Sequence, residues 1–237
     1  NARRISSEVR DSLAAKYGSD GFVLVEKFVA GAPLTREAPN KDDWASPEEL
    51  SAQLISDLRD AIAENPNTYS GGMIWVQGEA DTWETANPGL YRSRLISLVD
   101  RVSREVSSET GSAASTFANM ALVISELSDQ APAAPDRPNW SLIVEAQQIT
   151  ARASETVVSV DPDGLAESDG FTQDTMFDDN LHYSSGFSRA LSDGLVETLG
   201  ALSETMAGTN SQALGDYLRV FGTKSDDSIS GTWASEA

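Results

Sequence analysis

The chain contains no cysteine, which excludes disulfide bonds and thiol chemistry. Histidine occurs once, as His182, and aromatic residues make up only 7% of the 237 residues. Basic residues are scarce, because 17 Lys and Arg stand against 37 Asp and Glu, for a formal net charge of −20. Such a charge repels phosphates and argues against a nucleic-acid partner. No apolar run approaches the ~20 residues of a membrane span, and no signal-peptide pattern is present.

Short apolar runs and amphipathic stretches alternate along the chain. Strands are predicted at 22–25, 73–76, 121–125 and 156–160. Helices are predicted from about residue 5 to Gly18, from a capping box at 46–49 to Asn65, from 88 to 106, from 140 to 153 and from 187 to 206. This alternation predicts a three-layer α/β/α sandwich with a parallel sheet, of the flavodoxin-like kind, over residues 1–208.

A polar turn, Gln77-Gly78-Glu79-Ala80-Asp81, directly follows the strand predicted at 73–76. In open α/β sheets, ligands bind at the carboxyl ends of the strands. The Gln77 side chain offers the N–H donors that an oxyanion hole requires. A glycine at position 78 lets the backbone approach a ligand closely, so Gly78 and Asp81 are predicted to bind substrate. The alternative is a turn in which Gln77 satisfies backbone groups and the carboxylates are merely solvated.

The second polar motif is Asp179-x-x-His182, just before the last predicted helix. An Asp three residues ahead of a His can turn back, hold one ring nitrogen and leave the other as a general base. Taken alone, His182 could equally be a surface residue at a helix start. Together with the turn at 77–81, the pattern favours an acyl-transfer site in which His182 and Asp179 are catalytic.

The two motifs resemble blocks of the sialate O-acetylesterase-like carbohydrate esterases, a branch of the SGNH hydrolases. Trp75-Val76-Gln77-Gly78-Glu79-Ala80-Asp81 is similar to the family's Gln-Gly-Glu block, and Asp179-x-x-His182 to its last block. The stretch 25–34 resembles the second block, although it reads Ala30-Gly31 where two adjacent glycines are usual. The resemblance runs from about residue 6 to residue 206.

The resemblance implies hydrolysis of O-acetyl esters on a carbohydrate by a serine esterase mechanism that needs no cofactor or metal. It implies that the Gly31 amide joins Gln77 in the oxyanion hole. It also implies that Glu79 lies near His182 and orients it alongside, or in place of, Asp179. A peptidase-like or lipase-like SGNH enzyme is a weaker alternative, because the Gln-Gly-Glu block is characteristic of the carbohydrate branch.

The family's nucleophile is a serine in a Gly-Gln-Ser-Asn-like turn after the first strand, and nothing before Gly31 matches that turn. Ser6 and Ser7 are instead typical of a helix start. We therefore expect the chain to be a piece of a longer polypeptide, with the first strand and the nucleophile in a preceding N-terminal segment. The alternative function is a non-catalytic carbohydrate-binding or structural module of a large secreted or surface protein.

Residues 209–237 differ in composition from the rest and are predicted to be a linker or the start of a repeat region. The segment 222–232 matches the calcium-binding nonapeptide of RTX repeats at its first Gly, its Asp and its aliphatic position. An ordinary polar linker remains the equal alternative. If the repeat is real, calcium binds there and the protein is secreted or displayed on the cell surface.

Overall fold

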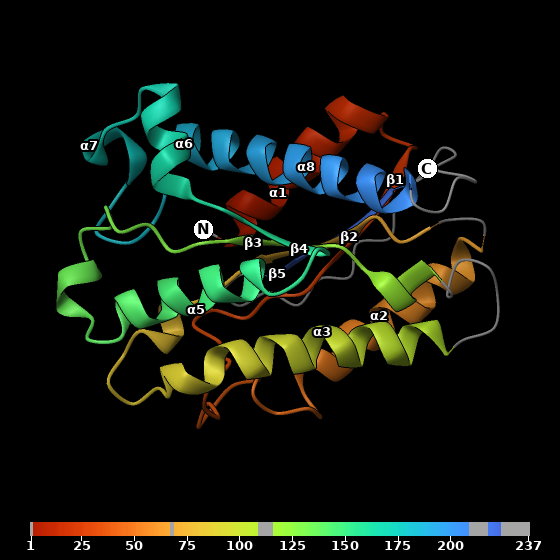
Figure 1. Cartoon of the computed structure of the whole chain (residues 1–237), viewed down its shortest axis with the longest axis horizontal. Coiled ribbons are helices and arrows are strands. Elements are labelled where there is room, and N and C mark those ends of the chain that lie inside the picture. The colour runs from red at the N-terminus through yellow and green to blue at the C-terminus, as the bar shows by residue number, and fades with distance from the viewer. Residues whose placement is uncertain (1, 67–68, 109–115, 209–217, 224–237) are drawn as a thin grey trace.

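The structure, a computed structural model, describes residues 2–66, 69–108, 116–208 and 218–223. A five-stranded parallel sheet lies between two layers of helices, which Figure 1 shows edge-on. The predicted three-layer α/β/α fold is therefore confirmed. Within the described residues, no helix combines the length and the apolar character that crossing a bilayer would require.

The sheet has the strand order β1-β5-β2-β3-β4. All neighbouring strands are parallel. Strand β2 is buried at every position, because helices cover both faces of the sheet. The strands are β1 Phe22–Glu26, β2 Gly72–Val76, β3 Leu122–Ser125, β4 Val157–Val160 and β5 Leu218–Thr223.

The helices divide between the two faces of the sheet (Figure 1). One layer contains α1 Ala2–Tyr17, α6 Pro162–Asp169, α7 Gln173–Met176 and α8 Ser185–Gly208. The other contains α2 Leu50–Glu64, α3 Tyr91–Ser107 and α5 Trp140–Arg152. Single 3-10 turns lie at η1 Glu79–Asp81, η2 Pro88–Leu90, η3 Thr116–Asn119 and η4 Ala134–Asp136.

The predicted apolar stripes form the core between the layers. Helix α8 places Phe187, Leu191, Leu195 and Leu199 on one face, and all four are 0% exposed. Residues four apart share a helix face, so the spacing alone directs these side chains toward the sheet. Burying each of them contributes on the order of 1.5–3 kcal/mol relative to exposure. Helix α1 buries Ile5, Val9 and Leu13 on one face in the same way.

Strand β5 lies in the middle of the sheet, between β1 and β2, and the sequence pattern does not predict it. Its register pairs Val220 with Leu24 of β1, and Gly222 with Ile74 of β2. This is the flavodoxin-like strand order, with β5 in the place of the first strand. The remainder of the repeat-like segment, residues 224–232, lies outside the described residues.

Two local expectations are wrong. The segment between β4 and His182, where the sequence pattern predicts no helix, contains helices α6 and α7. The capping box expected at 46–49 does not form, since α2 begins at Leu50 and Glu49 makes no side-chain cap. The buried Asp43 competes for both partners: its N–H donates to Glu49 Oε2 at 2.6 Å, and its Oδ1 accepts from Ser46 N at 2.7 Å.

Candidate active site

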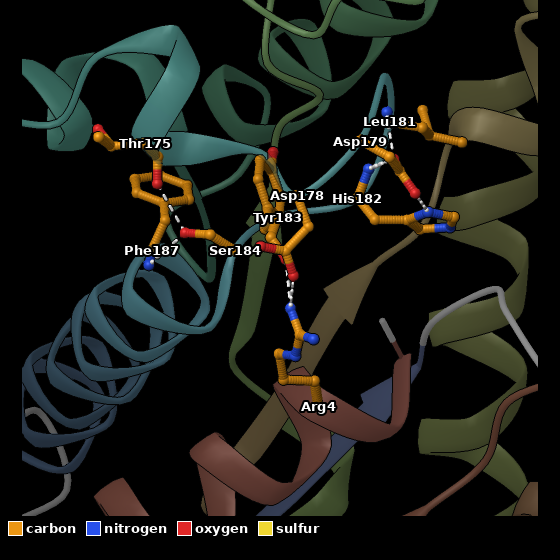
Figure 2. Close-up of polar contacts among 9 residues, drawn as sticks. All are labelled: Arg4, Thr175, Asp178, Asp179, Leu181, His182, Tyr183, Ser184 and Phe187. Atoms are coloured by element: carbon orange, nitrogen blue, oxygen red, sulfur yellow. Dashed lines mark hydrogen bonds and ion pairs between the residues drawn. The ribbon is translucent and has the colours of Figure 1, made fainter.

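The Asp179 carboxylate holds a ring nitrogen of His182, as the Asp-x-x-His spacing predicts (Figure 2). Asp179 Oδ2 lies 2.5 Å from His182 Nδ1. The other carboxylate oxygen accepts the backbone N–H groups of Leu181 and His182, each at 2.7 Å. The aspartate therefore closes a local turn and orients the imidazole at the same time.

These hydrogen bonds also fix the charge of the pair. Partial burial acts to raise the pKa of Asp179, but the hydrogen bonds from His182 and from the backbone of Leu181 outweigh it and lower the pKa to about 2. The carboxylate is thus ionised at neutral pH and can only accept. His182 Nδ1 must then carry the proton, which makes Nε2 the nitrogen that acts as a base in the neutral imidazole.

The loop that carries His182 is anchored from several sides. Phe177 and Tyr183 form an antiparallel bridge, and Asp178 N donates to His182 O at 2.8 Å. Arg4 Nη1, on helix α1, donates to Asp178 Oδ2 at 2.6 Å and to Tyr183 O at 2.8 Å (Figure 2). The Tyr183 ring packs 5.0 Å from the ring of Phe187 on α8. The imidazole therefore sits on a rigid support.

Gln77 lies at the carboxyl end of β2 and is 1% exposed. Its Nε2 donates to Asp81 Oδ2 at 2.7 Å and to Ala32 O at 3.1 Å. Both amide hydrogens are therefore used inside the protein. The Oε1 atom is buried and has no hydrogen-bond partner among the described residues. In this arrangement Gln77 joins the turn after β2 to the loop after β1.

Asp81 completes that junction and is 0% exposed. Its carboxylate accepts Leu34 N at 2.8 Å, Thr35 N at 2.9 Å and Thr35 Oγ1 at 2.6 Å, besides the Gln77 amide. These four donors fill the acceptor positions of an ionised carboxylate. Asp81, for which the sequence predicts substrate contact, therefore presents no surface to a ligand and positions the loop that contains Gly31.

Gly31 and Gly78 both adopt left-handed backbone conformations, with φ of 58° and 155°. Gly31 is partly exposed, and within the described part of the chain its N–H makes no hydrogen bond. Gly78 is buried, and a Cβ there would lie 3.1 Å from Ile143 Cγ2 and from Leu127 Cγ. The glycine at 78 therefore permits close packing against α5, rather than the approach to a ligand that its position suggests.

The turn after β2, which contains Glu79, and the histidine loop both contact the segment 133–137. Burial raises the pKa of Tyr183 well above its ordinary value, and the negative charge of Glu79 raises it further. Arg137 Nη1 donates to Glu79 O at 2.8 Å, and Ala133 N donates to Asn180 O at 2.8 Å. The segment 133–137 thus contacts both motifs and brings them to one edge of the sheet. The sequence assigns no role to Arg137.

Two buried polar side chains hold the backbone carbonyl of Gln77. Tyr91 Oη and Gln147 Nε2 donate to Gln77 O, at 2.8 Å and 2.9 Å. Tyr91 Oη also accepts from Trp75 Nε1 at 3.1 Å. Burial raises the pKa of Tyr91, which therefore stays a neutral donor. Trp75 is a core residue with no access to a ligand, as its 0% exposure requires.

Within the described residues, no group of three or more His, Asp or Glu side chains is arranged to hold a metal ion. Residues 26–198 match the model of a carbohydrate esterase family described as sialic acid-specific acetylesterase. That range includes the loop with Gly31, the turn at 77–81 and the Asp179–His182 pair. A search of curated proteins finds no match for the chain.

Proposed function

Because the chain belongs to the sialic acid-specific acetylesterase family of carbohydrate esterases, we propose that it hydrolyses O-acetyl esters on a carbohydrate by a serine esterase mechanism. The single observation that carries this proposal is the Asp179–His182 hydrogen bond, with its ionised carboxylate and its defined imidazole tautomer. The family itself implies carbohydrate acetylesterase activity and an acetylated carbohydrate as substrate. The roles of individual residues are our proposal.

In the proposed mechanism, a serine Oγ attacks the acetyl carbonyl carbon while His182 Nε2 takes the hydroxyl proton. Asp179 keeps Nδ1 protonated and stabilises the imidazolium that forms. His182 then passes the proton to the departing sugar oxygen, which leaves an acetyl-enzyme. Water, deprotonated by His182, then attacks this ester; the bond to the serine Oγ breaks, His182 returns the proton to that oxygen, and acetate is released. We propose that the serine belongs to an N-terminal segment of a longer polypeptide.

For the oxyanion hole we propose the Gly31 amide, together with the amide of the nucleophile itself. The partly exposed Gly31 N–H supports this role, because it makes no hydrogen bond within the described residues. Gln77 has both hydrogens engaged, so we assign it the task of holding the loop through Ala32 and Asp81. Losing a direct oxyanion donor typically costs ~10²–10³ in rate.

The resemblance implies that Glu79 orients His182 alongside, or in place of, Asp179. The 2.5 Å contact at Nδ1 supports Asp179 in that role. We propose that Glu79 acts on the site through its negative charge, which contributes to the raised pKa of Tyr183 beside the histidine. Gly78 and Asp81 are proposed to shape the site from within the protein, without touching substrate.

The proposal is tested by acetate release from O-acetylated N-acetylneuraminic acid. The 237-residue chain and a polypeptide extended at its N-terminus are compared, each with and without His182→Ala. We expect activity in the extended polypeptide, its loss in His182→Ala, and only a trace in the 237-residue chain. Full activity of the 237-residue chain would show that the nucleophile lies within it. Inactivity of the extended polypeptide on this substrate and on ethyl acetate would favour a non-catalytic carbohydrate-binding module.

We also propose that the protein is secreted or displayed at the cell surface, and that calcium binds in the repeat-like segment 222–232. The acidic composition and the nonapeptide match support both ideas. Calcium titration of a polypeptide extended at its C-terminus, followed by circular dichroism, tests the second. A calcium-dependent gain of structure is expected, and an unchanged spectrum would leave a plain linker.

A further inference from the structure

Trp83 is an exposed aromatic residue at the edge of the candidate site. Its exposed fraction is 47%, the highest among the large hydrophobic side chains of the described residues. It follows η1, two residues after Asp81, and so continues the turn that begins at Gln77. Most exposed apolar side chains need no explanation. Trp83 differs from an isolated exposed residue in that its ring and its backbone both make specific contacts.

The side chain of Arg137 covers part of the Trp83 ring, with the guanidinium carbon 4.3 Å from the ring centroid. Arg137 is itself fixed, because its Nη1 donates to Glu79 O at 2.8 Å and to Thr82 Oγ1 at 3.2 Å. A guanidinium over an indole is a favourable cation–π contact. The ring is therefore supported by Arg137 on one side, while 47% of the residue is exposed to solvent.

The backbone on either side of Trp83 is fixed as well. Asn139 Nδ2 donates to Trp83 O at 2.7 Å, and Asn139 N donates to Thr82 O at 3.0 Å. The same segment, 133–139, contacts the histidine loop through Ala133 and Asn180. The indole thus lies beside the segment that contacts both halves of the site, with its backbone held by Asn139 and its ring held by Arg137. Binding to such a surface costs little side-chain entropy.

We propose that Trp83 is a stacking platform for the pyranose ring of the substrate, with Arg137 as its positioning residue. This inference rests on the proposed esterase function and adds the group that recognises the sugar. A pyranose presents a face of C–H bonds with partial positive charge, which suits the negative face of an aromatic ring. Stacking on Trp83 would hold the sugar while an acetyl group reaches the proposed catalytic residue His182, whose loop contacts the same segment through Asn180 and Ala133.

The binding step is tested on the 237-residue chain, which needs no nucleophile for it. The chain is labelled with ¹⁵N-tryptophan, and the indole signal of Trp83 is identified by its loss in Trp83→Phe. The methyl glycoside of N-acetylneuraminic acid should shift that signal, whereas sorbitol, an open-chain polyol, should not. Trp83→Ala should weaken binding of the glycoside about tenfold, equivalent to ~1.4 kcal/mol.

Trp83→Phe keeps an aromatic face and should retain part of the affinity. Ile149→Ala removes another exposed side chain, on α5, and should leave the affinity unchanged. Sugar binding is read on the 237-residue chain and acetate release on the extended polypeptide, which separates failure of this inference from failure of the proposed function. An unshifted Trp83 signal, or equal affinity of Trp83→Ala and the parent chain, would overturn the inference.

The extended polypeptide provides a second readout. Trp83→Ala should raise KM for O-acetylated N-acetylneuraminic acid about tenfold and leave kcat/KM for ethyl acetate unchanged, since ethyl acetate has no ring to stack. An equal loss on both esters would show that Trp83 only supports the local structure, and would also overturn the inference.

Discussion

The amide of Gln77 donates a hydrogen bond to the carboxylate of Asp81 over 2.7 Å, inside the protein and away from solvent. This contact joins the turn after β2 to the loop after β1, because Asp81 also accepts the N–H groups of Leu34 and Thr35. The Gln-Gly-Glu-x-Asp pattern thus encodes a rigid junction. The chemistry of the site depends on that junction even where its residues do not touch a ligand.

Asp81→Asn should destabilise the fold by about 3 kcal/mol, because it removes a buried acceptor and points an N–H₂ group at other donors. The free energy of unfolding, measured by urea denaturation, checks this. Asp60→Asn, on the exposed side of α2, is the matched control and should stay within about 0.5 kcal/mol of the parent. Equal effects of the two substitutions would contradict the role of Asp81 as a buried anchor.

Gly78→Ala should destabilise the fold by at least about 2 kcal/mol. The residue has a φ of 155°, and a Cβ would press against Ile143 and Leu127. Gly89→Ala provides the comparison, since Gly89 is exposed and a Cβ there meets only Asn87 Oδ1, at 3.4 Å. Thermal unfolding of both variants should show a lower Tm for Gly78→Ala alone.

The pKa values of Asp179 and Glu26 are shifted in opposite directions, so their contributions to stability should depend on pH in opposite ways. The pKa of Asp179 is lowered to about 2, so its contribution to stability is present above its ordinary value near 3.8 and disappears as the pH falls from about 5 toward 2. Burial raises the pKa of Glu26, and Arg10 only partly offsets this. Its contribution is therefore present below about pH 4.5 and is lost as the pH rises.

Urea denaturation between pH 2 and pH 6 tests both signs. The stability difference between the parent chain and Asp179→Asn should shrink as the pH falls. For Glu26→Gln, the variant should gain stability relative to the parent as the pH rises through the pKa of Glu26. The effect at Asp179 should be small, because half of its side chain is exposed. The same pH dependence in both variants would contradict these pKa directions.

Much of the fold can be predicted from local sequence patterns, because the spacing of apolar residues indicates which side chains are buried. The spacing of Leu191, Leu195 and Leu199 specifies the face of α8 that meets the sheet, and all three are fully buried. The Asp179–His182 contact is equally local, since three residues of chain suffice to form it. Other local patterns fail because a further residue takes the expected hydrogen bonds. The buried Asp43 bonds to both Ser46 and Glu49, so the capping box expected between these two residues does not form.

The site itself is less predictable from the sequence, because its geometry depends on contacts between distant segments. Asp81 anchors the loop after β1 because its carboxylate accepts the N–H groups of Leu34 and Thr35, which are distant in the sequence. Arg137 carries no motif, and its importance appears only from its contacts with Glu79 and Trp83. Strand β5 pairs with β1 on one side and β2 on the other, contacts between distant segments that a local sequence pattern does not reveal.

Strand β5 makes a prediction that separates a sheet strand from a linker. A polypeptide that ends at residue 208 should be less stable to urea than one that ends at residue 223, because β1 and β2 each lose a parallel partner. Equal stability of the two would show that residues 218–223 add nothing to the fold and act as a linker.

The rate of acetate release by Asp179→Asn, compared with Asp178→Asn, tests the central claim most directly. Both variants neutralise one carboxylate of the same loop in the extended polypeptide, but only Asp179 contacts His182, whereas Asp178 pairs with Arg4. Asp179→Asn should lower kcat on O-acetylated N-acetylneuraminic acid by roughly 10²–10⁴-fold, because the imidazole loses its defined tautomer. Asp178→Asn should stay within about threefold of the parent, since a partly exposed ion pair contributes little. Equal rates for the two variants would contradict a catalytic Asp179–His182 pair.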